Sequence, residues 1–326
     1  MIRRFSAILI VACISQAAGV QGFELSFPVD CALDRSCYIQ QYVDHDTTAG
    51  ASDFTCSGLS YDGHKGTDFA LITLRQMEDG VNVLSAAEGR VAGLRDGMKD
   101  QILSSKNRSD FQGKDCGNGV VITHETGWTT QYCHMKQGSI RVQKGQKVAA
   151  GEILGQIGLS GRTEFPHLHL TVRKDQKVID PFHPKDRINC TTSDQTTDQT
   201  TLWKDPLDYR AGGLLSAGFS DAVPDYATIK AGTATGPQLT RGSNALVLWV
   251  YGFGLRAEDV LRFEIRGPEG RIFAHDATMP KAQAQMMRAA GLKRKQNLWP
   301  KGAYQGTVKL IQNGNELENK IVQFEF

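Results

Sequence analysis

The 326-residue chain lacks three features that would each indicate a particular class of protein. No C-x-x-C pair occurs in it, so the cysteine-ligated type of zinc site is not indicated. Beyond the first 22 residues there is no long apolar run, so we expect no transmembrane segment. Those 22 residues hold only two charged side chains, Arg3 and Arg4, and the rest of the chain has equal numbers of basic and acidic residues. This balance gives no electrostatic case for binding nucleic acid.

The first 22 residues have the pattern of a cleaved export signal. A basic head at Arg3 and Arg4 precedes an apolar stretch at 5–12 that is too short to span a bilayer, and small residues follow at 17–19. We expect cleavage between residues 18 and 23 and an exported protein, periplasmic or extracellular. Cys13 lies unusually near the start for a lipoprotein signal, which makes a lipid anchor the less favoured alternative.

Six cysteines remain after that cleavage, an even number that favours three disulfides in an oxidising compartment. Two strand-like runs, 119–124 and 128–132, lie between Cys116 and Cys133, and a hairpin there would bring the two sulfurs together. A bond closing a loop of that size stabilises the fold by about 3 kcal/mol. The expected pairs are therefore Cys116–Cys133 and, to complete the set, Cys37–Cys56 and Cys31–Cys190.

A chain of this length is expected to form two folded units. Between residues 81 and 170, runs rich in valine, isoleucine and threonine alternate with glycine turns, and helical periodicity is absent, which predicts a mainly β unit with antiparallel sheet. Residues 191–201 contain no apolar side chain. We therefore place a peptidase-sized unit at 23–190, a polar linker at 191–202 and an accessory unit at 203–326.

The accessory unit has the pattern of a small β-sandwich, possibly immunoglobulin-like. Strand-like runs occur at 245–251, 260–265, 307–311 and 321–326, separated by turn sequences such as 267–270 and 312–315. One helix is expected at 282–290. The unit contains no pattern that indicates chemistry, and glycan binding, blocking of a groove and docking of a partner are all compatible with it.

Two histidine motifs about a hundred residues apart carry the chemistry. Asp68 follows His64 by four residues, and His169 follows His167 by two, a spacing that places both rings on one face of a strand. A catalytic zinc site uses three protein ligands of these types and leaves one position for water. We predict that His64, Asp68 and His169 bind one Zn²⁺, with His167 beside the open position.

His134 follows directly on a strand-like run and is the natural candidate for a second group that acts on the attacking water or the developing oxyanion. His124 and Glu125 begin like the H-E-x-x-H motif of another zinc-protease class, but Trp128 occupies the fifth position and excludes that class.

From about residue 61 to residue 180 the chain closely resembles the lysostaphin/LytM-type zinc endopeptidases. Six elements occur in the order typical of that family: H-x-x-x-D at 64–68, A-x-x-G-x-V at 86–91, G-N-x-V-x-I at 117–122, Y-x-H at 132–134, a run of regularly spaced valines and glycines at 142–157, and H-L-H at 167–169. Met135 replaces the usual leucine, and Cys133 adds a cysteine beside a histidine. Neither change removes a ligand.

The resemblance implies a compact antiparallel β core, the duplicated hybrid motif, with a groove across it. It implies that His64, Asp68 and His169 hold zinc, which activates a water to attack the scissile carbonyl, while His134 and His167 assist. The implied substrates are the stem peptides or cross-bridges of bacterial peptidoglycan. Asn118 and Arg162 are interpreted as groove residues. Equally weighted alternatives are a turn-capping role for Asn118 and a solvent-exposed position without a role for Arg162.

Two other functions compete with this one. Some members of the family have lost the ligands and activate other hydrolases, so a catalytically silent envelope regulator is the main alternative. A secreted protease or lytic toxin directed at proteins is the third hypothesis. The intact set of five residues favours activity on peptidoglycan.

Overall fold

The computed structural model describes residues 22–105, 107–185, 190, 200–234, 239–295 and 297–326. The predicted export signal, apart from Gly22, and residues 191–199 of the predicted linker lie outside this part of the chain. Within it, no helix has both the length and the apolar character needed to cross a membrane. The architecture is mainly antiparallel β, as predicted.

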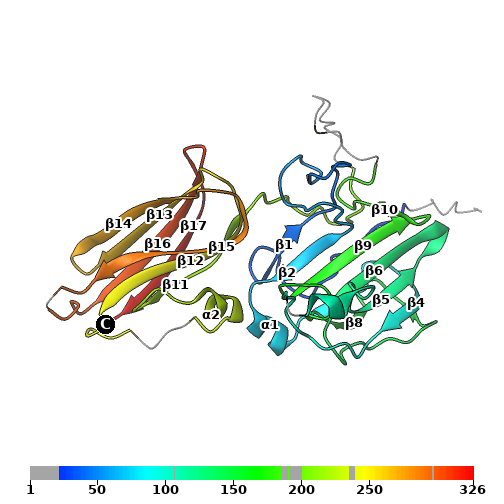
Figure 1. Ribbon diagram of the computed structural model, residues 1–326, viewed down its shortest axis with the longest axis horizontal. Coiled ribbons are helices and arrows are strands. Elements are labelled where there is room, and N and C mark those ends of the chain that lie inside the picture. The colour runs from blue at the N-terminus through cyan, green and yellow to red at the C-terminus, as the bar shows by residue number, and fades with distance from the viewer. Residues whose placement is uncertain (1–21, 106, 186–189, 191–199, 235–238, 296) are drawn as a thin grey trace, which may run out of the picture.

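The first half of the chain folds around one eight-stranded sheet (Figure 1). Along the sheet the strands run β1-β2-β9-β6-β5-β4-β7, with β10 added beside β9, and all neighbours are antiparallel. Their bounds are β1 Cys37–Gln41, β2 Thr67–Leu71, β4 Gly89–Arg95, β5 Asn118–Thr123, β6 Trp128–Met135, β7 Lys147–Val148, β9 His167–Lys174 and β10 Lys177–Ile179. A separate pair joins β3 (Asn82–Leu84) to β8 (Ile153–Gln156), and helix α1 spans Leu74–Asp79.

Strand β9 explains how this sheet positions polar side chains. Leu168, Leu170 and Val172 alternate with the polar residues of the strand and are buried in the hydrophobic core. The alternation leaves His167 and His169 on the opposite face, because successive side chains of a strand point to opposite sides of a sheet. One face of β9 therefore holds the fold together, and the other is available for chemistry.

The second half of the chain is a β-sandwich of a three-stranded and a four-stranded sheet (Figure 1). The smaller sheet runs β11-β12-β15 and the larger runs β14-β13-β16-β17. Apolar side chains from both sheets form one buried cluster between them, as expected for a sandwich. The strands are β11 Gly213–Ser220, β12 Ala245–Leu255, β13 Val260–Gly267, β14 Gly270–Thr278, β15 Gln283–Lys293, β16 Ala303–Gln312 and β17 Asn315–Glu325, and helix α2 spans Tyr226–Ala231.

The sandwich packs against the eight-stranded sheet through a shared apolar core. The rings of Tyr38 on β1 and Phe253 on β12 are both fully buried, and their centroids are 4.5 Å apart. The amide of Gln285 on β15 donates to the Tyr38 hydroxyl at 3.0 Å and to Gln40 Oε1 at 2.8 Å. Arg210 pairs with both Asp34 and Glu318 across the same junction. The two halves are therefore joined by buried contacts.

The helix predicted at 282–290 is wrong, because this segment is strand β15. Its alanines, glutamines and methionines favour a helix when taken alone. In the structure the segment pairs with β12 over nearly its whole length, from Gln283 opposite Leu255 to Lys293 opposite Ala245. Pairing with a long, buried strand outweighs local propensity here.

Two of the predicted disulfide pairs also need correction. Cys116 is bonded to Cys133, the pair that the hairpin predicts, but the structure joins Cys31 to Cys37 and Cys56 to Cys190 in place of Cys37–Cys56 and Cys31–Cys190. A tight turn explains the first pair, because the backbone N–H groups of Ser36 and Cys37 both donate to Ala32 O and bring the two cysteine Cα atoms to 6.1 Å.

Candidate functional site

Strand pairing and the loop before β2 bring together the three residues predicted to bind metal. Asp68 on β2 lies directly opposite His169 on β9, and its Oδ1 is 2.8 Å from His169 Nδ1. His64 lies in the loop before β2, with Nε2 3.2 Å from Asp68 Oδ1 and 3.1 Å from His169 Nδ1. The two nitrogens and one oxygen form a compact triangle with buried or half-buried side chains.

This triangle fits a zinc ion. Tetrahedral ligands at about 2.0–2.1 Å from zinc are about 3.3 Å from one another, close to the spacing found here. His64 Nδ1 donates to the carbonyl of Tyr42 at 2.7 Å, and His169 Nε2 is 3.0 Å from Thr171 Oγ1. Because the outer nitrogen of His64 donates to a carbonyl, its inner nitrogen presents a lone pair, and Thr171 Oγ1 can accept from the outer nitrogen of His169 in the same way. Metal-binding histidines are normally oriented like this.

The site is electrostatically prepared for a cation. Burial alone would raise the pKa of Asp68, but the neighbouring imidazoles of His64, His167 and His169 hold it well below its usual value, so the carboxylate is ionised. Burial disfavours the charged form of His64, yet the attraction of Asp68 outweighs burial and raises the pKa of His64. An ionised carboxylate between imidazoles is a suitable ligand set for a divalent metal.

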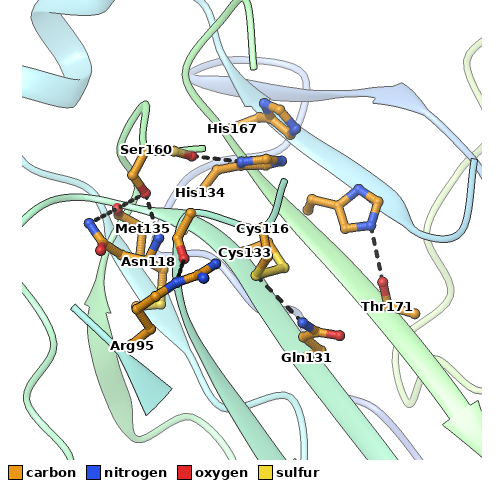
Figure 2. Close-up of a disulfide and its surroundings, with 12 residues drawn as sticks. Arg95, Cys116, Asn118, Gln131, Cys133, His134, Met135, Ser160, His167 and Thr171 are labelled. Carbon is orange, nitrogen blue, oxygen red and sulfur yellow. Dashed lines mark hydrogen bonds between the residues drawn. A yellow bond between two sulfur atoms is a disulfide. The ribbon is translucent and has the colours of Figure 1, made fainter. Parts of the chain in front are cut away.

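His134 and His167 lie beside this triangle and face one another, with ring centroids 4.7 Å apart (Figure 2). His134 Nδ1 donates to the carbonyl of Ser160 at 2.9 Å, and His167 Nδ1 donates to that of Phe165 at 3.0 Å. His167 Nε2 is 3.5 Å from Asp68 Oδ1. Both rings are thus held in the tautomer whose Nε2 is free to accept a proton.

Burial lowers the pKa of both of these histidines, and for His134 the neighbouring His167 and His169 lower it further. Both rings are therefore neutral near pH 7. The backbone of His134 has a φ of 62°, in the left-handed region, and its N–H donates to Cys116 O at 2.8 Å. A backbone in this uncommon conformation is held by the surrounding structure, which thereby also fixes the position of the His134 side chain.

Four residues that orient the histidines escaped the sequence reasoning: Thr171, Tyr42, Ser160 and Phe165. Thr171 follows His169 by two on the same face of β9, and this spacing could have revealed it. Tyr42, Ser160 and Phe165 act through backbone carbonyls, for which residue type gives no signal.

Asn118 and Arg162, both predicted to line the groove, have different environments. Asn118 is fully buried, where its side chain accepts from Met98 N and donates to Met98 O and Met135 O. The structure therefore places Asn118 beneath the site, with a structural role. The Arg162 side chain is about half exposed, lies on the groove and is 3.7 Å from Asp115 Oδ1.

An open groove of about 820 Å³ contains the triangle together with His134 and His167. Exposed and half-buried polar side chains form much of its wall, which suits an extended polar substrate better than a small apolar one. Residues that line it away from the histidines include Tyr61, Lys65, Arg108, Gln131, Glu164 and Arg173.

Comparison with known proteins identifies this part of the chain. The model of peptidase family M23 matches residues 62–181, the segment that holds all five site residues. Residues 62–181 form a peptidase family M23 domain. The resemblance found in the sequence motifs is confirmed for this segment, and the comparison covers none of the sandwich.

Several named proteins are similar to this part of the chain. The chain is 31% identical over 128 residues to cell division protein DipM of Caulobacter vibrioides. The aligned region covers 39% of the chain and 18% of DipM. It is 35% identical over 106 residues to peptidoglycan DD-endopeptidase ShyA of Vibrio cholerae. Here the aligned region covers 32% of the chain and 19% of ShyA. The chain thus spans about a fifth of these relatives. A zinc-containing peptidase from Vibrio cholerae of known structure matches at 25% identity and a TM-score of 0.29, over 43% of this chain and 38% of that one.

Proposed function

We propose that the protein is a zinc-dependent endopeptidase that hydrolyses peptide cross-links of bacterial peptidoglycan. The observation that carries this proposal is the triangle of His64 Nε2, Asp68 Oδ1 and His169 Nδ1, with edges of 2.8–3.2 Å, at the base of an open groove in an M23 domain. The relative ShyA, named as a peptidoglycan DD-endopeptidase, supports this substrate class.

In this proposal His64, Asp68 and His169 hold one Zn²⁺ per chain. When bound, the ion would lower the pKa of a water molecule and polarise the carbonyl of the scissile bond. The neighbouring imidazoles keep Asp68 ionised despite its burial, and the hydrogen bonds to Tyr42 O and Thr171 Oγ1 keep the two ligand rings in place.

His134 and His167 move the proton. Because each ring is neutral and donates from Nδ1 to a backbone carbonyl, its Nε2 can accept the proton of the attacking water. The protonated ring then donates from Nε2 to the oxyanion or to the leaving amine. Two rings 4.7 Å apart allow one to act on the water while the other stabilises developing charge.

Export to the periplasm or the cell exterior belongs to the same proposal. Three disulfides join all six cysteines of the described chain, which suits an oxidising compartment. The basic and apolar start of the sequence is consistent with an export signal.

The test is muropeptide analysis by mass spectrometry after incubating purified sacculi with the zinc-loaded protein. We expect cross-linked dimers to be converted to monomers by the wild type and by His275→Ala, a control at an exposed histidine of the sandwich. His134→Ala should bind zinc normally and be about 10²–10⁴-fold slower. Unchanged dimers with the zinc-loaded wild type would support the silent regulator instead.

A further inference from the structure

One partly buried cation of the groove has no carboxylate partner among the described residues. Arg173 is half buried, and no carboxylate of the described residues lies within ion-pair distance of its guanidinium. The other groove cations differ, because Lys65 and Arg108 are exposed to solvent and Arg162 lies beside Asp115. Partial burial of an unpaired charge is unfavourable, so Arg173 indicates an anion that the chain does not supply.

The position of Arg173 ties it to the candidate active site. It lies on the same face of β9 as His167, His169 and Thr171, because all four alternate along one strand. From His169 to Arg173 the strand advances about 13 Å. An extended peptide covers that distance in about four residues, and the arginine side chain itself can span part of it.

The guanidinium is also held in a fixed direction. Its Nη1 donates to Gln131 Oε1 at 3.0 Å, while Gln131 Nε2 donates to the sulfur of Cys116 at 3.5 Å (Figure 2). This leaves most of its five N–H donors without a partner among the described residues. An oriented guanidinium with free donors matches the two oxygens of a carboxylate.

We propose that Arg173 is a carboxylate-binding subsite of the groove, and that the substrate is a peptide with a free carboxylate about two to four residue lengths from the bond that is cut. This proposal rests on the proposed endopeptidase function and makes it more specific. It predicts that the enzyme distinguishes acidic stem peptides from the same peptides with their carboxyl groups amidated.

The experiment uses the full-length exported protein, loaded with zinc, and two soluble cross-linked muropeptide dimers. One dimer has free stem carboxylates, and the other carries primary amides in their place. Cleavage is measured as kcat/KM, and binding is measured by calorimetry on the slow His134→Ala variant. Arg173→Gln is the test substitution, and Arg141→Gln, at an exposed arginine outside the groove, is the matched control.

We expect the wild type to prefer the free-carboxylate dimer by about 10- to 100-fold in kcat/KM, as for the loss of a hydrogen bond to a charged group. Arg173→Gln should lose that preference and cleave the two dimers with equal kcat/KM. Arg141→Gln should behave as the wild type. Zinc content and melting temperature show whether each variant is folded.

Equal kcat/KM of the wild type for both dimers would overturn the subsite and leave the endopeptidase function intact, and this result does not depend on any variant. A preference that persists in Arg173→Gln would also overturn it. Preferential binding without cleavage would refute the endopeptidase function and support the subsite. Absence of both binding and cleavage would contradict both proposals.

Discussion

Thr171 Oγ1 lies 3.0 Å from Nε2 of His169, two residues away on the same face of β9. The hydroxyl fixes the ring so that Nδ1 faces Asp68. Replacing Thr171 with Val keeps the shape of the side chain and removes the hydrogen bond. We expect zinc affinity to fall about 10- to 100-fold, as for other residues that orient metal ligands.

Competition with a chromophoric chelator measures that affinity. Thr278→Val, at an exposed position of the sandwich, is the control and should bind zinc as the wild type does. An unchanged affinity in Thr171→Val would show that the hydroxyl does not orient His169.

Asn118→Ala should destabilise the fold without removing the metal. The substitution leaves the part-buried Met98 N and Met98 O without this partner and removes one of the two donors to Met135 O, the other being Ser160 Oγ. We expect the free energy of unfolding to fall by about 2–3 kcal/mol, measured by urea denaturation. If Asn118 instead contacted substrate, KM would rise while stability stayed the same.

The contact between the two halves should stabilise both. Phe253 is fully buried against Tyr38, so Phe253→Ala removes a large apolar side chain from the shared core. We expect a loss of about 3–5 kcal/mol, whereas Leu317→Ala, at a residue that is 56% exposed, should have little effect. Equal unfolding midpoints for the two variants would contradict the shared core.

The pH dependence of stability should include a contribution from His124. Partial burial lowers the pKa of this ring in the folded protein, so the unfolded chain binds its proton more readily. This contribution is complete above the unfolded pKa of about 6.5 and is lost as the pH falls below it. His124→Gln should therefore lose less stability between pH 7 and pH 5 than the wild type; an identical loss would contradict the assignment.

Disulfide mapping tests the topology of the first half. A tryptic digest under non-reducing conditions should yield peptides that join Cys31 to Cys37, because trypsin cuts at Arg35 between them, and peptides that join Cys56 to Cys190. Peptides that join Cys37 to Cys56 would contradict the structure.

The sequence motifs point to His64, Asp68 and His169 as a possible ligand set, and the structure brings these three side chains together. Asp68 and His169 sit in strands, and pairing of β2 with β9 brings them opposite each other. The ring orientations could not be predicted, because Tyr42 and Ser160 contribute only backbone carbonyls that approach from distant loops.

Long-range pairing also explains the errors in the predicted fold. Residues 283–293 form a strand only because β12 lies beside them, and no local pattern contains that information. Cys31 and Cys37 meet through a turn in which three backbone N–H groups, those of Arg35, Ser36 and Cys37, donate to the carbonyl of Ala32. Asn118 belongs to a motif that resembles a groove element, yet its side chain is used to hold the backbone of Met98 and Met135.

The most direct test of the account is zinc titration of the metal-free protein with cleavage of cross-linked muropeptides as the readout. We predict no cleavage after chelation, full recovery at one zinc ion per chain, and no recovery in His169→Ala, while the control His275→Ala recovers fully. Cleavage at the full rate by the chelated protein, or by His169→Ala, would contradict the claim that His64, Asp68 and His169 form a catalytic metal site.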